Sequence, residues 1–140
     1  MSDIDEIYDL FTWDDRYTPE EYKRRVERGL ELSKNAEYLF PFLQPFLPDQ
    51  KSKSIWEPCA KVLAERSDEE LAPYLPFLFE WLQDLNWPGS EIILNRLAEM
   101  PASLTAEELK LCRSKAEKDH DEMWLLWMKE FESRQSYINC

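Results

Sequence analysis

The sequence predicts an all-α fold of stacked antiparallel helix pairs, and three observations lead to this prediction. β-Branched residues are scarce, with two Val, three Thr and six Ile against nineteen Leu, which disfavours strands. A helix-start pattern, Ser or Thr followed three residues later by Glu, occurs four times at plausible positions. Helical segments also recur every 34 to 35 residues, which is typical of an α-solenoid of about three repeats.

Helices are expected in eight segments of the chain. Their ranges are 4–11, 19–33, 36–47, 55–65, 71–84, 88–100, 106–118 and 122–133. Prolines interrupt the third of these. Four of the helices open with a capping box, in which a hydroxyl accepts a backbone N–H and a Glu reaches back to the cap. The boxes pair Thr18 with Glu21, Ser54 with Glu57, Ser67 with Glu70, and Thr105 with Glu108.

Equivalent positions recur from one predicted repeat to the next. The residues Asp49, Asp84 and Asp119 are spaced by 35. In the helix after each Asp, apolar positions keep a spacing of 34. These are Cys59–Ile93–Trp127, Ala60–Leu94–Met128 and Leu63–Leu97–Phe131. Because one helix pair cannot bury its apolar face alone, we expect the pairs to stack over a common core, with the N-terminal helices as a cap.

Length and charge restrict the class of protein. A chain of 140 residues is most simply one domain, with a helical N-terminal cap over 1–46, a repeat core over 47–131 and a tail over 132–140.

The net charge of −12 argues against a nucleic acid partner, which needs clustered Lys and Arg. It favours a basic protein or peptide. No apolar run approaches the ~20 residues of a membrane span, so no membrane partner is expected.

Residues that could carry catalysis are few. The three cysteines, Cys59, Cys112 and Cys140, have neither disulfide-framework nor zinc spacing. They indicate a reducing cytoplasm, and the acidic N-terminus lacks the pattern of a signal peptide. His120, the sole histidine, lies among acids in a predicted helix–helix turn, where a solvated position is favoured over a metal site. We predict no enzyme, no metal and no cofactor.

The segment EWLQDLNWPGSEII, residues 80–93, is interpreted as a structural corner between two helices. Asp84 can accept amides of the turn, and Asn86 tolerates turn geometry. Trp87 precedes a proline and is therefore extended, while Pro88 suits the first helical position. Trp81 lies one helical turn before Asp84 and can pack beneath the corner. A combined structural and binding role is the alternative for this segment.

Acids near aromatic side chains are candidates for partner binding in two places. Trp13, Asp14 and Asp15 lie in the acidic connection between the first two helices, and Glu80 and Asp84 lie in the corner segment. Trp13 either packs the N-terminal cap against the repeats or stands exposed as an anchor for a partner. Acidic and aromatic residues together would suit a basic partner.

Part of the chain resembles a known family. The stretch SDEELAPYLPFLFEWLQDLNWPG, flanked by LPDQKSKSIWEPCAKVLAERS and DHDEMWLLWMKEF, resembles a small bacterial domain family of unknown function with a W-L-Q-D-x-N-W-P motif. The resemblance covers about residues 47–131 and implies a HEAT- or armadillo-like helical stack. It implies no activity, because none is established for the family. Relatives more often carry a bulkier residue at Gly89, and the first 46 residues look like an addition.

These observations lead to three hypotheses about function. The first is a non-enzymatic protein-interaction module with an acidic, aromatic-containing surface. The second is a cytoplasmic immunity-type inhibitor of a basic bacterial toxin, since complementary charge steers such partners together. The third and most remote is an enzyme, which would need a pocket gathering His120 or several acids with perturbed pKa values.

Overall fold

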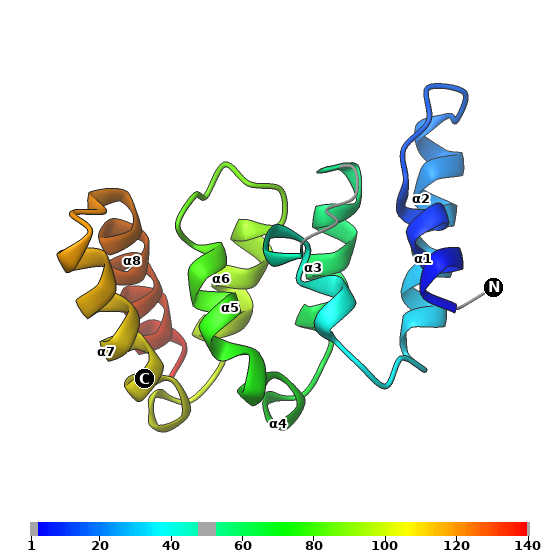
Figure 1. The fold of residues 1–140 in the computed structure, drawn as a ribbon. Coiled ribbons are helices and arrows are strands. Elements are labelled where there is room, and N and C mark those ends of the chain that lie inside the picture. The colour runs from blue at the N-terminus through cyan, green and yellow to red at the C-terminus, as the bar shows by residue number, and fades with distance from the viewer. Residues whose placement is uncertain (1–2, 48–52, 140) are drawn as a thin grey trace. The chain divides into compact units, whose positions relative to one another are not determined.

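The computed structural model of the chain describes residues 3–47 and 53–139, and within these ranges it contains helices and turns but no strand (Figure 1). The predicted all-α fold is confirmed. The chain divides into two compact units, Met1–Glu65 and Arg66–Cys140. No helix in the described ranges is both long enough and apolar enough to cross a membrane. Stacking of all the helix pairs into one solenoid stays a prediction.

The first unit is built around a helical hairpin. Its elements are α1 (Asp3–Phe11), α2 (Pro19–Ser33), the short 3-10 turns η1 (Phe40–Phe42), η2 (Gln44–Phe46) and η3 (Lys53–Ile55), and α3 (Trp56–Ala64). α2 begins with the predicted capping box, because Thr18 accepts the N–H of Glu21 and Glu21 accepts the N–H of Thr18. The fully buried side chains of this unit include Phe11, Phe42, Leu43 and Ile55.

The two helices of the hairpin approach closely at one glycine. A Cβ atom added to Gly29 would lie 2.4 Å from Cε1 of Phe11, which is far inside van der Waals contact. The Phe11 ring is fully buried, so it has little room to move away. Gly29 is therefore selected by the packing of α1 on α2 rather than by helix propensity, which it lowers.

The predicted helix over residues 36–47 is wrong, because the segment forms η1 and η2 instead. Pro41 and Pro45 lack the N–H that an α-helix would use and so stop it from propagating. This segment packs against α1, where the Tyr8 hydroxyl donates to the Pro41 carbonyl at 2.6 Å. The Gln44 amide in turn donates to the Tyr8 hydroxyl oxygen at 3.2 Å. The first unit continues to Glu65 because α3 packs against α2, η1 and η2.

The second unit contains two helix pairs. Its elements are α4 (Asp68–Leu71), η4 (Ala72–Tyr74), α5 (Leu75–Trp81), α6 (Ser90–Ala98), α7 (Ala102–Lys118) and α8 (Glu122–Ile138). α5 packs against α7 and α6 packs against α8, so equivalent helices of successive pairs lie side by side (Figure 1). Ile93 and Leu97 of α6 and Met128 and Phe131 of α8 are buried, as the repeat predicts, whereas Trp127 is only partly buried.

Two of the four predicted capping residues, Ser54 and Thr105, are not the N-cap of an α-helix. Ser67 and Glu70 make the expected box at α4. Ser54 instead lies in η3 and accepts the backbone N–H of Trp13. Thr105 lies inside α7, which already begins at Ala102, and its buried hydroxyl accepts the Gln135 amide at 2.8 Å. Both hydroxyls therefore accept a hydrogen bond from a residue far away in the chain.

The predicted tail over 132–140 is also wrong in its described part. α8 continues to Ile138 because the Gln135 amide is held by two acceptors, the Met100 carbonyl at 3.0 Å and the Thr105 hydroxyl. Gln135 is itself buried. Cys140 and Asp49, which were used in the sequence argument, lie outside the described residues.

Candidate functional site

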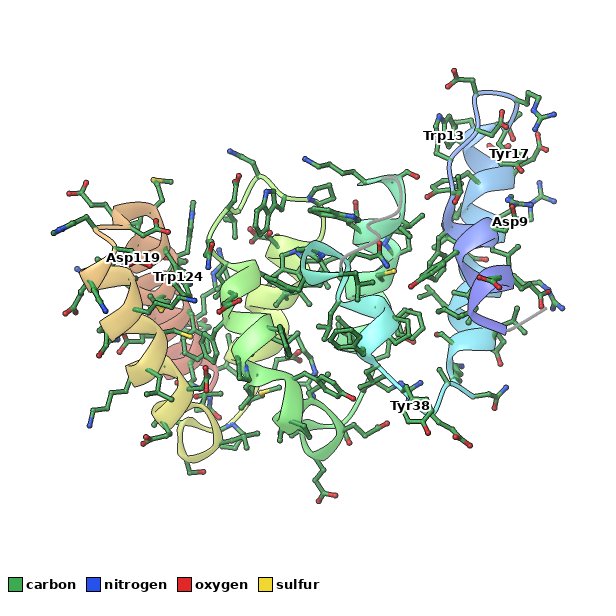
Figure 2. All side chains as sticks on the ribbon, in the orientation of Figure 1. Asp9, Trp13, Tyr17, Tyr38, Asp119 and Trp124 are labelled. Atoms are coloured by element: carbon green, nitrogen blue, oxygen red, sulfur yellow. The ribbon has the colours of Figure 1, made fainter. Side chains whose placement is uncertain are left out.

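The connection between α1 and α2 holds the first candidate group, which belongs to the first unit (Figure 2). The Trp13 side chain is 41% exposed. Its backbone N–H donates to the Ser54 hydroxyl at 3.2 Å, and its Nε1 donates to Asp15 Oδ1 at 3.0 Å. The Trp13 ring meets the Tyr22 ring edge-on, with centroids 5.1 Å apart. Trp13 is thus anchored within the first unit and half exposed at the same time.

The acid beside Trp13 is already neutralised by its neighbour. Asp14 Oδ1 accepts the backbone N–H and the Nε of Arg16, and Asp14 Oδ2 accepts Nη2 at 2.8 Å. Hydrogen bonds from the Arg16 side chain and backbone lower the pKa of Asp14 to about 2. The carboxylate of Asp14 therefore has little charge left to attract a basic partner.

A cavity of about 310 Å³ lies beside Trp13. Its lining residues are Trp13, Tyr22, Val26, Ser54, Glu57, Pro58 and Lys61. This lining includes one acid and one base, and Arg25 stacks on the nearby Tyr17 ring at 4.6 Å. The predicted acidic character is therefore weak in this part of the first unit.

The corner segment lies in the second unit as a tight turn between α5 and α6. The Asp84 carbonyl accepts the Trp87 N–H at 3.1 Å and the buried Ser90 hydroxyl at 2.8 Å. Asp84 Oδ1 accepts the Asn86 N–H at 2.8 Å. Trp81 is fully buried, whereas Trp87 and Pro88 are partly buried. The turn is thus closed mainly by hydrogen bonds to Asp84.

Gly89 ends this turn in a left-handed conformation, with φ of 88°. Residues with a side chain rarely adopt this conformation, because Cβ crowds the following carbonyl oxygen. The glycine therefore suits the backbone here, although the family resemblance led us to expect a bulkier residue. α6 consequently begins at Ser90 rather than at Pro88.

Glu80, the other acid predicted in this segment, is paired within the unit. Its Oε1 lies 3.1 Å from Lys115 Nζ, which donates to it from α7. The pair ties α5 to α7 and uses the charge of Glu80 internally. Glu80 therefore joins α5 to α7, and its carboxylate is already paired rather than available to a partner.

A second turn, between α7 and α8, carries the sole histidine. His120 is exposed and adopts a positive φ of 55°, a conformation that histidine tolerates better than bulky residues do. The next residue, Asp121, caps α8, since its Oδ1 accepts the Trp124 N–H at 3.0 Å. The Asp121 carboxylate is thereby oriented by the helix start.

These two turns enclose a cavity of about 400 Å³, which we name the turn pocket. It is lined by Gln83, Asp84, Leu85, Asn86, Asp121, Met123 and Trp127. The pocket brings the predicted Asp84 together with Asp121, Met123 and Trp127, which sequence analysis did not place in a binding site. The available signal was the 35-residue repeat, because it puts the two turns at equivalent ends of successive helix pairs.

The carboxylates of the turn pocket have no internal cation. Within residues 3–47 and 53–139 no ion pair involves Asp84 or Asp121, and the hydrogen bonds they accept go to Oδ1 in each case. This differs from Asp14 with Arg16, and from Glu80 with Lys115. The pocket therefore keeps an unneutralised negative charge.

The aromatic residue of the pocket also has an unused polar atom. Trp127 Nε1 is buried and has no hydrogen-bond partner in the described part of the chain. A buried donor without a partner costs about 1–3 kcal/mol. Beside it, Met123 is 55% exposed. The pocket thus combines negative charge, an aromatic ring and an apolar rim, which together can bind a cationic side chain.

The two described thiols, Cys59 and Cys112, are not among the residues that line the pocket. Burial raises the pKa of the Cys59 thiol well above its ordinary value. Burial, followed by the nearby Glu108 carboxylate, raises the pKa of Cys112 to about 12. Both thiols therefore stay protonated at neutral pH, and a protonated thiol is a poor nucleophile.

In the described residues no three His, Cys, Asp or Glu side chains are grouped as metal ligands.

Comparison with known proteins identifies one family. A family model described as a domain of unknown function, DUF5071, matches residues 47–139, about two thirds of the chain. The matched range includes both turns of the turn pocket. Neither the curated proteins nor the solved structures include a match.

Proposed function

The chain belongs to the DUF5071 family, whose description names no activity, and we propose that it is a non-enzymatic module that binds a basic protein or peptide. The observation that carries this proposal is the turn pocket, where Asp84 and Asp121 lie beside the ring of Trp127 and pair with no cation of residues 3–47 and 53–139. Such a pocket offers charge and a stackable ring to a cationic side chain.

The charge of the whole chain supports the same proposal. The net charge is −12, and residues 67–101, which include the corner segment, contribute −6 of it. An excess of negative charge speeds association with positively charged partners and disfavours association with negatively charged ones. A basic protein would therefore be attracted at long range and then held at the pocket.

The distribution of ion pairs adds a second line of support. Several acids of the second unit are neutralised by the chain itself, as Asp68 is by Arg96 at 2.7 Å and Glu80 is by Lys115. No base in the described part of the chain pairs with the two acids of the pocket. The turn pocket is therefore one place where the chain leaves negative charge for a partner.

The experiment is a titration of the full chain with two short labelled peptides of equal length. One alternates Arg and Lys with Gly, and the other carries Gln at the charged positions. We expect saturable one-to-one binding of the basic peptide that weakens as salt rises from about 50 mM to about 300 mM, because salt screens exposed charges. Equal binding of both peptides, or binding without saturation, would contradict the proposal.

A narrower form of the proposal is an immunity-type inhibitor of a basic bacterial toxin. The net charge of −12 on a chain of 140 residues favours it, since acidic inhibitors bind basic toxins through complementary charge. The gene neighbourhood provides the test. A toxin gene encoding a basic protein beside the gene for this chain would support the narrower form, and its consistent absence would count against it.

A further inference from the structure

We infer that the turn pocket binds a single arginine side chain of the basic partner, an inference that rests on the proposed function. The pocket has about 400 Å³ of space, which is within the lower range of small-ligand cavities. It is formed by two turns of one unit, the one after α5 and the one before α8. One side chain of the partner can therefore enter between them.

The acceptors for the cation come from both turns. Asp84 Oδ1 is used by the Asn86 N–H and Asp121 Oδ1 by the Trp124 N–H. These bonds orient the two carboxylates, while Oδ2 of each makes no hydrogen bond to the described residues. The side-chain amide of Gln83, which also lines the pocket, likewise makes none. The pocket thus presents two oriented acceptors and an adaptable amide.

The aromatic wall of the pocket provides the second component. Trp127 lines the cavity, and the indole is the ring that attracts cations most strongly. Its Nε1 is buried and has no partner in the described residues, which leaves a donor for a carbonyl oxygen of the bound segment once the side chains at the rim adjust. Met123, 55% exposed at this rim, can cover the aliphatic part of the incoming side chain.

Arginine fits this arrangement better than lysine does. The planar guanidinium has several donors in a fixed fork, so it can bond carboxylates on two sides while its face stacks on a ring. The lysine ammonium is a compact, strongly hydrated charge that cannot stack in this way. Two carboxylates from different turns beside one indole ring therefore select for arginine.

The test compares two double variants of the full chain that remove equal charge. Asp84→Asn with Asp121→Asn neutralises the pocket but keeps an Oδ1 acceptor at both turns, and Asn caps helices as well as Asp does. Asp119→Asn with Glu122→Gln neutralises two exposed acids that flank Asp121 in the same turn but do not line the pocket. The amide spectrum of each variant shows whether it is folded.

Three peptides that differ at one position serve as probes, with arginine, lysine or the neutral isostere citrulline at that position. Binding is followed by two-dimensional NMR, using the amides of residues 83–86 and the indole N–H of Trp127, which Trp127→Phe assigns. We expect the arginine peptide to shift these signals and to bind at least about tenfold more tightly than the citrulline peptide. The pocket variant should lose about tenfold in affinity and the neighbouring variant less than threefold.

Each other outcome overturns a defined part of the inference. Equal losses in the two double variants would mean that general charge, and not the pocket, holds the peptide, and would leave the proposed function intact. Equal affinity for the lysine peptide would overturn the selection for arginine. Failure of every basic peptide to bind the native chain, including the polybasic one, would overturn the proposed function as well.

Discussion

The indole Nε1 of Trp124 (labelled in Figure 2) donates a hydrogen bond of 2.9 Å to the backbone carbonyl oxygen of Phe79. Both side chains are buried. This bond joins α8 to α5 within the second unit. The Phe79 ring also meets the Phe131 ring edge-on, with centroids 5.1 Å apart. One backbone acceptor and two rings therefore hold two helix pairs together at this point.

Replacing Trp124 by Phe should destabilise the second unit. The substitution removes one of two donors to the Phe79 carbonyl, which keeps the Leu82 N–H at 3.1 Å. Loss of that hydrogen bond costs about 0.5–1.5 kcal/mol, in addition to the volume lost. Trp127→Phe is the matched control, because its Nε1 has no partner among the described residues. Urea unfolding followed by circular dichroism should show the larger loss for Trp124→Phe, and equal losses would refute the role of this bond.

Replacing Thr105 by Val should also be destabilising. The Thr105 hydroxyl is buried inside α7 and accepts the Gln135 amide at 2.8 Å, so its removal leaves a buried donor with one acceptor fewer, at a cost of about 1–2 kcal/mol. Ser103→Ala, on the exposed side of the same helix, should stay within about 0.5 kcal/mol of the native chain. A neutral Thr105→Val would show that the buried contact contributes little.

Replacing Gly29 by Ala tests the close contact of α1 with α2. Alanine gains about 1 kcal/mol of helix propensity over glycine. Its methyl group would, however, lie 2.4 Å from the buried Phe11 ring, and such overpacking costs about 1–3 kcal/mol. We expect a net loss of stability of about 1 kcal/mol, whereas Glu27→Ala on the exposed face should cost nothing measurable. A more stable Gly29→Ala variant would contradict the close packing.

The acid–base behaviour of Asp14 tests its pairing with Arg16. Because hydrogen bonds from Arg16 lower the pKa of Asp14 to about 2, the pair favours the folded state above the ordinary carboxyl pKa of about 3.9. That contribution is lost as the pH falls toward 2. NMR titration of the carboxyl carbon should give the low midpoint in the native chain and a higher one in Arg16→Gln. Arg24→Gln should leave the midpoint unchanged.

The two described thiols should resist alkylation in the folded chain. Cys59 is fully buried, and the pKa of Cys112 is raised to about 12, so little thiolate exists near pH 8. We expect iodoacetamide to label either thiol at least about a hundredfold more slowly than in urea. Labelling is located by mass spectrometry of peptides. Rapid native labelling of Cys112 would mean that its thiol is ionised and accessible.

Local signals in the sequence were sufficient for much of the helical structure. The helix over 19–33 is confirmed at both ends, because its cap, Thr18 with Glu21, is formed by neighbours in the chain. The repeat placed Ile93, Leu97 and Phe131 in the core correctly, because burial depends on helical spacing. Ser54 and Thr105 do not cap an α-helix as predicted, and their hydroxyls bond partners 41 and 30 residues away.

Fewer residues of the candidate site than of the helices could be predicted from the sequence. Asp14 and Glu80 were predicted as binding acids, but Asp14 pairs with Arg16, two residues away, and Glu80 pairs with Lys115, 35 residues away. Asp121 and Trp127 join Asp84 in one cavity because α8 packs beside α6. Whether a carboxylate can attract a partner thus depends on whether the fold already pairs it with a cation. The spacing of acids along the sequence does not show which carboxylates are paired.

The most direct measurement is a set of intermolecular NOEs between the native chain and the arginine peptide. We predict contacts from the Cδ protons of the peptide arginine to the ring protons of Trp127, together with shifts at Asp84 and Asp121. A peptide that binds but shows its contacts at the Trp13 ring, or at no assigned residue of the turn pocket, would contradict the site proposed for partner binding.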